Sequence, residues 1–402
     1  MVSVLEQKYS FTRAFPVSEY QSRVRKAREL MAKNGIDALL LTQRVNVEYF
    51  SGALNTLWGC LDRPFSLILP RDGEPALVIP RLLECVTART TWIKDIRCYP
   101  SSPPKDAERI VCPAMIASTV EDLGLGKAVI GTEAGYDLRL NMALREFEAV
   151  KGGVPDAKFV DAYDVIWGCR IFKSNAEIER IRKASTMTCN ALKRVYESHL
   201  KEGMTEADYA REVAKAFLEE EGEARDVGFV YVGVMNDPWL GPMIDRAPTD
   251  RKLKSGDMLI ADIGAAFGGY TSDMTRWAVI GKSSGKMKEL HDLAAQSTTA
   301  VNEATRPGIP ICDLVKAANA PLEKAGYPMA IARIGHGLGL DVHEPPSLGK
   351  ENTTLTQPGM IFTIEPCLQY NEFIIWVEDA IVITEKGYEN LTPMAKNLYE
   401  VR

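Results

Sequence analysis

The sequence lacks the features of several protein classes. It has no run of 18 apolar residues, no block of lysine and arginine, and no Cys-x-x-Cys pair among its eight cysteines. A membrane span needs such an apolar run, so we expect none. A net charge of −6 without a basic cluster gives no reason to expect nucleic acid as a partner. Widely spaced cysteines fit the reduced thiols of a cytoplasmic protein better than a zinc ribbon or a disulfide scaffold.

The length of the chain predicts two domains. At 402 residues it exceeds the size at which one hydrophobic core usually stops growing. We place the boundary after residue 170, because Ser174 and Glu177 have the spacing of a capping box and begin a long helical pattern. The first domain is then 1–170 and the second 171–402. The start of the sequence has no apolar segment followed by a small-residue cleavage site, so we expect no secretory signal.

The first domain alternates helical and strand patterns. A capping-box pattern at Ser18 and apolar residues at helical spacing predict a helix over 17–34, which Gly35 ends. Two apolar runs, 66–70 and 76–80, flank a glycine-containing turn and predict a hairpin. This alternation favours a compact α/β domain. The domain contains no P-loop, no Gly-x-Gly-x-x-Gly and no Gly-x-Ser-x-Gly motif.

Two aspartates of the second domain lie in apolar surroundings. Asp262 is at the end of the apolar run DMLIADIGAA, and Asp273 follows eleven residues later, after the turn residues Gly268 and Gly269. A hairpin of this length returns the second strand beside the first, so both carboxylates can point into one pocket. An isolated carboxylate within a buried strand is very costly and needs a partner or a metal.

Three further polar residues have a similar setting. His336 is flanked by glycines that leave room for a ligand or another backbone, and Glu365 and Glu378 are each bracketed by apolar strand residues. The remaining histidines are His199, His291 and His343. The first two lie beside charges in helical patterns, and we expect both at the surface.

A metal site explains these residues together better than separate structural roles do. Each alone has an ordinary explanation: a turn aspartate, a glutamate on a solvated strand face, or a satisfied histidine. Five of them in apolar strands or glycine-bracketed turns favour a metal site. Oxygen ligands with one imidazole suit Mn, Co, Fe or Zn. Two such metals ~3.5–4 Å apart can share a water, lower its pKa and polarise a carbonyl.

The order of these residues resembles that of the pita-bread metallohydrolases, a family that includes aminopeptidase P, prolidase, methionine aminopeptidase and creatinase. The motifs are IADIG, YTSDMTR, IGHGLGLDVHE, TIEP and VEDAIVIT. RIFKSNAEIERIRKA resembles the family's interdomain junction, and RVNVEYFSG with RPFSLIL resembles its N-terminal domain. The resemblance implies an α+β protein: a ribonuclease-H-like α/β (creatinase N-terminal) domain followed by a pseudo-twofold pita-bread catalytic domain. It also implies a homodimer and two divalent metal ions.

The resemblance also implies a role for each ligand. Asp262 and Asp273 would bind one metal, and Asp273 and Glu378 would bridge the pair. His336 and Glu365 would complete the other metal.

Two of the residues would then act in catalysis. Glu365 would also be the general base for the attacking water. His343 matches the family histidine that contacts the substrate carbonyl or the tetrahedral intermediate, where an imidazole stabilises oxyanion charge.

One departure from the family lies at Asp245. The peptidases carry a histidine seventeen residues before the first aspartate ligand, and this sequence has Asp245 there. An ionised aspartate only accepts hydrogen bonds, so at a substrate site it prefers a cationic or N–H-bearing group to a carbonyl. Asp245 is equally explained as a loop residue paired with Arg246 or Arg251.

Three further residues are candidates for substrate contact. Trp376 stands where many members have arginine, and Trp239 lies in an NDPW motif that resembles a loop of the dimethylsulfoniopropionate lyase branch. Their rings could form an aromatic-walled pocket that holds a cation; the alternative for Trp376 is a large apolar strand residue. Arg63 has a setting similar to that of a creatinase-branch arginine that reaches a substrate carboxylate in the partner subunit, or it is a turn arginine.

Three functions follow from these patterns. The leading hypothesis is a dinuclear metal-dependent hydrolase of a small amide substrate, like an Xaa-Pro dipeptidase or aminopeptidase P, in which a metal-bridging water attacks. The alternative is a non-peptidase enzyme on the same scaffold, a creatinase-like hydrolase or dimethylsulfoniopropionate-lyase-like enzyme that acts on a small methylated or zwitterionic metabolite. The third is a binding protein that has lost catalysis, which the retained carboxylates argue against, because burying them is costly.

Overall fold

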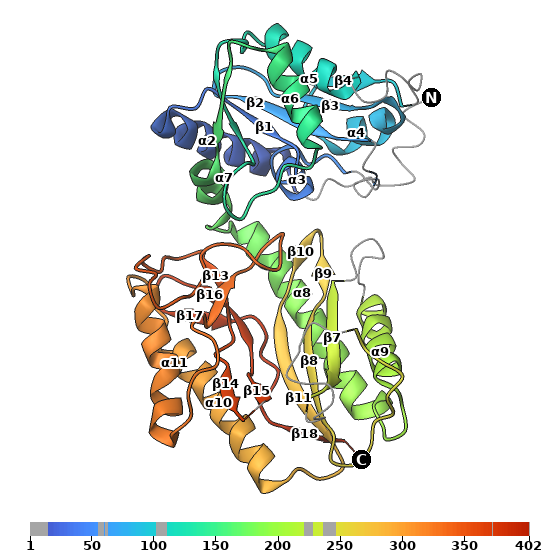
Figure 1. Ribbon diagram of the computed structural model, residues 1–402, viewed down its shortest axis with the longest axis vertical. Coiled ribbons are helices and arrows are strands. Elements are labelled where there is room, and N and C mark those ends of the chain that lie inside the picture. The colour runs from blue at the N-terminus through green and yellow to red at the C-terminus, as the bar shows by residue number, and fades with distance from the viewer. Residues whose placement is uncertain are drawn as a thin grey trace. The chain divides into compact units, whose positions relative to one another are not determined.

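The protein is described from a computed structural model, which covers residues 15–54, 60, 63–101, 111–220, 228–235, 247–371 and 373–401. The chain divides into two compact units, Met1–Arg170 and Ile171–Arg402, each described by itself (Figure 1). No helix among the described residues is long and apolar enough to cross a membrane.

The first unit is built around a six-stranded mixed sheet in the order β4-β3-β2-β1-β5-β6. Strand β2 pairs antiparallel with both β1 and β3, and the other neighbours are parallel. The strands are β1 (Ala38–Leu41), β2 (Ser66–Pro70), β3 (Ala76–Pro80), β4 (Asp95–Tyr99), β5 (Val129–Thr132) and β6 (Lys158–Asp161). The hairpin expected over 66–70 and 76–80 is therefore confirmed.

Helices cover this sheet. They are α2 (Val17–Asn34), α3 (Arg44–Ser51), α4 (Glu84–Thr90) after the short turn η1 (Arg81–Leu83), α5 (Val111–Asp122), α6 (Leu144–Gly153) and α7 (Tyr163–Arg170). Helices α5 and α6 pack on the face that carries Leu40, Ile68 and Val78, while α2 packs against α7. The helix expected over 17–34 is confirmed, with Gly35 at φ +66° as its C-cap. The capping box at Ser18 is wrong, because the N-cap is the residue before Val17 and no side chain caps the helix.

The second unit contains two four-stranded sheets. The first has the order β18-β11-β8-β7 and the second β12-β13-β16-β17. The first consists of β7 (Phe229–Val234), β8 (Met258–Gly264), β11 (Met274–Ile280) and β18 (Tyr399–Val401). The second consists of β12 (Gly335–Gly337), β13 (Ile361–Ile364), β16 (Asp379–Ile383) and β17 (Tyr388–Asn390). Two small hairpins complete the strands: β9 (Ala266–Phe267) with β10 (Tyr270–Thr271), and β14 (Leu368–Tyr370) with β15 (Phe373–Ile375).

Each of the two sheets has its own pair of helices. Helices α8 (Asn175–Arg194, followed by the π-helical turn η2, Val195–His199) and α9 (Glu206–Glu219) pack on the first sheet. Helices α10 (Gly285–Ala304) and α11 (Ile311–Ala325) lie beside the second sheet (Figure 1). The repeated combination of two helices and a four-stranded sheet agrees with an internally duplicated domain. The capping box of α8 is also confirmed, since Ser174 and Glu177 exchange backbone-to-side-chain hydrogen bonds of 3.3 and 2.9 Å.

Strand alternation decides which face of the first sheet can carry a site. Along β8, Leu259, Ala261 and Ile263 belong to the core under α8 and α9. Because successive side chains of a strand point to opposite faces, Asp262 lies on the other face, together with Ile260. That face turns away from the first helix pair and toward the second half of the unit.

The two helical histidines differ in exposure. His199 is exposed, as expected, and lies 3.1 Å from Glu212. The expectation that His291 lies at the surface is wrong: it is fully buried in α10. Its neighbours Leu290 and Ala294 are also buried. The buried face of α10 is therefore wider than the charged residues beside His291 indicated.

Candidate metal centre

The aspartates are brought together by the expected hairpin. Asp262 is in β8, and Asp273 directly precedes β11, whose Thr275 is the antiparallel partner of Asp262. Between the two strands, Gly268 and Gly269 form the tip with φ values of +61° and +82°, a region that favours glycine. The hairpin therefore places both carboxylates at one end of the sheet.

The second sheet supplies the histidine and the two glutamates. His336 is the middle residue of β12, opposite Thr363 of β13. Glu365 directly follows β13 and Glu378 directly precedes β16, so both lie one residue outside the strands in which we expected them. The backbone N–H of Glu378 donates to the carbonyl of Thr275 at 3.2 Å. This bond joins the two sheets at the site.

Glycine next to His336 permits a close backbone approach. A Cβ on Gly335 would lie 1.9 Å from the carbonyl oxygen of Thr363, and one on Gly337 would lie 2.3 Å from that of Pro345. Gly335 also has φ +149°, which L side chains rarely adopt. The flanking glycines thus let β12 reach the position from which His336 faces the carboxylates.

Three of the five predicted ligands form a compact buried group. One ligand atom each from Asp273, His336 and Glu378 lies within 4.8 Å of the other two. His336 Nε2 is 3.6 Å from Asp273 Oδ2 and 3.5 Å from Glu365 Oε1. His336 Nδ1 is 2.9 Å from the carbonyl oxygen of Gly337, which can only accept, so Nδ1 carries the proton. The lone pair of Nε2 consequently faces the carboxylates, as a metal ligand requires.

Burial raises the pKa values of four carboxyl groups in the cluster. Burial, followed by repulsion from Glu365, raises the pKa of Asp262 to about 8. Burial raises the pKa of Glu365 to about 7, although the nearby Arg333 cation opposes this. Burial and neighbouring carboxylates raise the pKa values of Asp273 and Glu378 well above their usual range.

The same residues fit a divalent cation. Burial lowers the pKa of His336 to about 3, so its ring is neutral and able to bind metal. Asp273 Oδ1 is buried and has no hydrogen-bond partner among the described residues. A cation bound between these groups would compensate the carboxylate charge and occupy that oxygen.

His343 lies at the exposed edge of this cluster. Its ring centroid is 4.0 Å from that of His336, with the planes inclined by 51°. Burial, followed by the charge of Arg333, lowers the pKa of His343. The imidazole is therefore neutral near pH 7, with an N–H group available as a donor.

Trp376 is buried rather than exposed on the wall of a pocket. It is 1 % exposed, and its ring packs edge-on against Trp277 with centroids 5.9 Å apart. Its indole N–H donates to Thr275 Oγ1 at 2.9 Å, and Thr275 in turn donates to Glu378 Oε2 at 2.8 Å. Contact between Trp376 and substrate stays a prediction.

The three other predicted substrate contacts lie outside the described residues of the second unit. Arg63 belongs to the first unit, where its backbone N–H donates to the backbone carbonyl of Cys60 at 3.2 Å. Asp245 and Trp239 lie outside the described residues. Their roles stay predictions.

Sequence reasoning missed two residues of the site, Thr275 and Arg333. Thr275 follows Asp273 by two positions on a strand, so strand periodicity alone could have assigned it to the same face. Arg333 NH2 lies 3.4 Å from Glu365 Oε1, with 39 % of the Arg333 side chain exposed. No sequence pattern marks this arginine.

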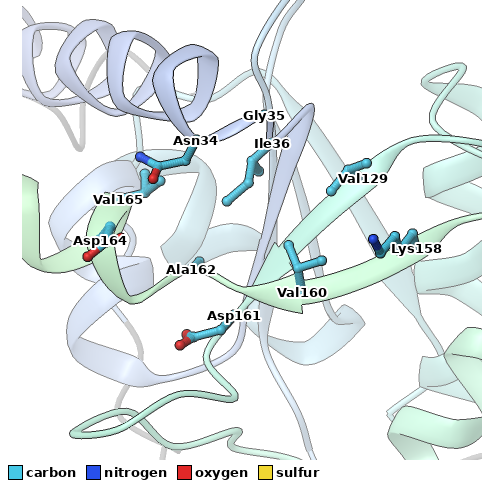
Figure 2. Close-up of a pocket in the computed structure, with 10 residues that line it drawn as sticks. All are labelled: Asn34, Gly35, Ile36, Val129, Lys158, Val160, Asp161, Ala162, Asp164 and Val165. Carbon is cyan, nitrogen blue, oxygen red and sulfur yellow. The ribbon is translucent and has the colours of Figure 1, made fainter.

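A separate pocket of about 300 Å³ lies in the first unit, between the end of α2, strands β5 and β6 and the start of α7 (Figure 2). Its polar lining residues are Asn34, Lys158, Asp161 and Asp164. None of the predicted site residues lines it. Within the described ranges, the one group of histidine, cysteine or acidic residues close enough to hold a metal is that of Asp273 in the second unit. The candidate site is therefore the carboxylate cluster.

Comparisons with known proteins agree with this assignment. Residues 179–385 match the model of Metallopeptidase family M24, and residues 23–172 match the Creatinase/Prolidase N-terminal domain. The chain is 30% identical over 383 residues to a probable dipeptidase PepE of Mycobacterium bovis. The aligned region covers 94% of this chain and 95% of the relative.

Solved structures agree in fold. The prolidase of Thermococcus sibiricus has a TM-score of 0.83 at 26% identity, covering 95% of this chain and 99% of that chain. Dipeptidase PepE of Mycobacterium ulcerans has a TM-score of 0.78 at 26% identity, covering 96% and 99%. The expected fold class, a creatinase-type N-terminal domain followed by a pita-bread catalytic domain, is thereby confirmed.

Proposed function

Because the chain belongs to metallopeptidase family M24, whose members use divalent metal ions, we propose that it is a dinuclear dipeptidase that cleaves Xaa-Pro dipeptides. The observation that carries the proposal is the convergence of ligand atoms of Asp273, His336 and Glu378 within 4.8 Å, in a buried cluster. The prolidase and dipeptidase names of similar proteins support the substrate class. We further propose two domains, 1–170 and 171–402, in a homodimeric cytoplasmic enzyme.

The metal ligands would be Asp262, Asp273, His336, Glu365 and Glu378, with Asp273 and Glu378 shared between the two ions. The donor set of oxygens and one imidazole suits Mn, Co, Fe or Zn. Bound there, the metals would supply an activated water and polarise the scissile carbonyl.

Glu365 is the proposed general base. Its Oε1 lies 3.5 Å from His336 Nε2, so the carboxylate is beside the proposed metal site, where a water can be activated. The Glu365 side chain is 18% exposed, more than those of Asp273 and His336. Its carboxylate can therefore accept the proton of an attacking water and return it to the leaving nitrogen.

His343 is the proposed donor to the substrate oxygen. Its exposed imidazole lies beside His336, and its lowered pKa keeps it neutral, so the ring N–H can stabilise a developing oxyanion.

The proposal is tested with purified protein that has been stripped of metal and then reloaded with Mn²⁺ or Co²⁺. We expect metal-dependent hydrolysis of Ala-Pro, and loss of that activity in Asp273→Asn. The matched control is Asp250→Asn, at an exposed position, which should retain activity. Metal binding without hydrolysis of any Xaa-Pro dipeptide would refute the substrate assignment.

A second candidate is favoured by Asp245, which stands where the peptidases have a histidine. It is the non-peptidase enzyme on the same scaffold. A panel of betaine-like and guanidino compounds distinguishes the two: turnover of one of these that Asp273→Asn abolishes, with no dipeptide cleavage, would establish the second function. Absence of any bindable metal would leave only a binding role.

A further inference from the structure

We propose that Trp376 is a positioning residue, because its indole N–H sets the direction in which the hydroxyl of Thr275 donates to Glu378. The inference rests on the proposed metal-binding role of Glu378. It assigns Trp376 a function different from the substrate contact expected from the sequence.

The three groups form a short chain of hydrogen bonds. Trp376 Nε1 is 2.9 Å from Thr275 Oγ1, and Thr275 Oγ1 is 2.8 Å from Glu378 Oε2. All three side chains are at most 1% exposed. Water therefore does not compete for these donors and acceptors, and each bond is stronger than at the surface.

The chemistry of the groups fixes the direction of the chain. An indole nitrogen can only donate, whereas a hydroxyl has one hydrogen and two lone pairs. Because Trp376 occupies a lone pair of Thr275 Oγ1, the hydrogen of Thr275 is left for Glu378. Without the indole donor, the hydroxyl can rotate to another acceptor, and the carboxylate loses a fixed partner.

The position of Trp376 is itself held firmly. Trp277 packs against its ring and donates its own indole N–H to the carbonyl of Trp376 at 2.5 Å. The two tryptophans come from different halves of the unit, since Trp277 is in β11 and Trp376 lies between β15 and β16. The donor thus reaches Thr275 from the opposite half.

A donor that holds a metal-binding carboxylate in place supports its binding of the ion. Thr275 is that donor for Glu378, and Trp376 holds the hydroxyl of Thr275. Loss of such a supporting donor reduces metal affinity by about 10- to 100-fold in known sites.

The test measures metal binding directly, by isothermal titration of metal-stripped protein with Mn²⁺, without substrate. Trp376→Phe keeps an aromatic ring and removes the donor, and we expect it to weaken binding by about 10- to 100-fold. Thr275→Val should weaken binding similarly, Thr275→Ser should retain it, and the double variant Trp376→Phe/Thr275→Val should be no weaker than Thr275→Val alone.

Trp92→Phe is the control, because it also removes an indole N–H that donates to a backbone carbonyl, that of Phe50 at 2.9 Å, in the first unit, which holds no proposed ligand. We expect its Mn²⁺ affinity to stay near that of the unchanged protein. An equal loss in Trp92→Phe would show an effect unrelated to the bond with Thr275 and overturn the inference. If Trp376→Phe fails to fold, Thr275→Val against Thr275→Ser decides: equal affinities overturn the inference.

The remaining outcomes separate the inference from the proposed function. Unchanged Mn²⁺ affinity in Trp376→Phe, with a higher KM, would show substrate contact and overturn the inference alone. Absence of Mn²⁺ binding by the unchanged protein would overturn both.

Discussion

The buried ion pair between Arg276 and Asp379 offers a prediction that can be worked through quantitatively. Arg276 NH2 lies 2.8 Å from Asp379 Oδ1, and both side chains are 0% exposed. The two residues directly follow Thr275 and Glu378 in the chain, so the pair fixes the backbone that carries part of the site. The proposed perturbation is Asp379→Asn, which keeps the shape of the side chain and removes its charge.

The remaining contacts determine the expected magnitude. Arg276 also donates to the carbonyl oxygens of Thr275 and Thr392, at 3.0 and 3.1 Å, but these carry no formal charge. Asp379 Oδ2 accepts from Asn302 at 2.8 Å and also pairs with the ammonium of Lys396, so the substitution removes the charge partner of both Arg276 and Lys396. Removing one partner of a buried ion pair costs about 3–5 kcal/mol. We therefore expect Asp379→Asn to lower the free energy of unfolding of the second unit by about this amount.

The control is an exposed ion pair in the same unit. Lys316 and Asp313 are 2.6 Å apart with side chains 77% and 46% exposed. Asp313→Asn should therefore cost no more than about 1 kcal/mol. The assay is hydrogen exchange followed by mass spectrometry, read on peptides of β11 and β16, since a chain with two units does not unfold in one transition. A loss in Asp379→Asn no greater than that in Asp313→Asn would refute the reasoning.

Three further predictions concern other parts of the molecule. Burial lowers the pKa of His291 to about 4; the unfolded chain binds the proton first, so stability should fall by about 3 kcal/mol as pH falls from about 6.5 to about 4. His291→Leu should remove that part of the decline in acid denaturation, and an unaltered profile would contradict it. Gly335→Ala forces a Cβ against the Thr363 carbonyl, so we expect the stability measured by hydrogen exchange on peptides of β12 and β13 to fall by at least about 2 kcal/mol; unchanged exchange would disprove the close approach. Asp245→His should raise kcat/KM for Xaa-Pro dipeptides in a steady-state assay, whereas no change would exclude this position as the cause of altered specificity.

The ligand residues could be predicted because each breaks a local rule. A carboxylate such as Asp262 in an apolar strand is costly unless it has a partner. The glycine pair indicated a hairpin tip, and the hairpin brings the strand that follows Asp273 back beside that of Asp262. The close approach at Gly335 likewise has a signal, since glycine beside a histidine in a strand indicates crowding.

Other features depend on contacts that no local pattern contains. Trp376 and Thr275 are about a hundred residues apart in sequence, and their bond exists because the two halves of the unit meet. His291 was misplaced because its charged neighbour Asp292 suggested a solvated face, whereas α10 is covered along a stripe that also includes Leu293. Tertiary packing widened that stripe beyond what the helical period indicated.

The measurement that tests the central claim most directly is the number of metal ions bound per chain, determined by elemental analysis after equilibration with Mn²⁺. We expect two ions per chain in the unchanged protein. Asp273→Asn should bind fewer, because Asp273 is the proposed bridge between the ions. Absence of bound metal in the unchanged protein, or full occupancy in Asp273→Asn, would contradict the account.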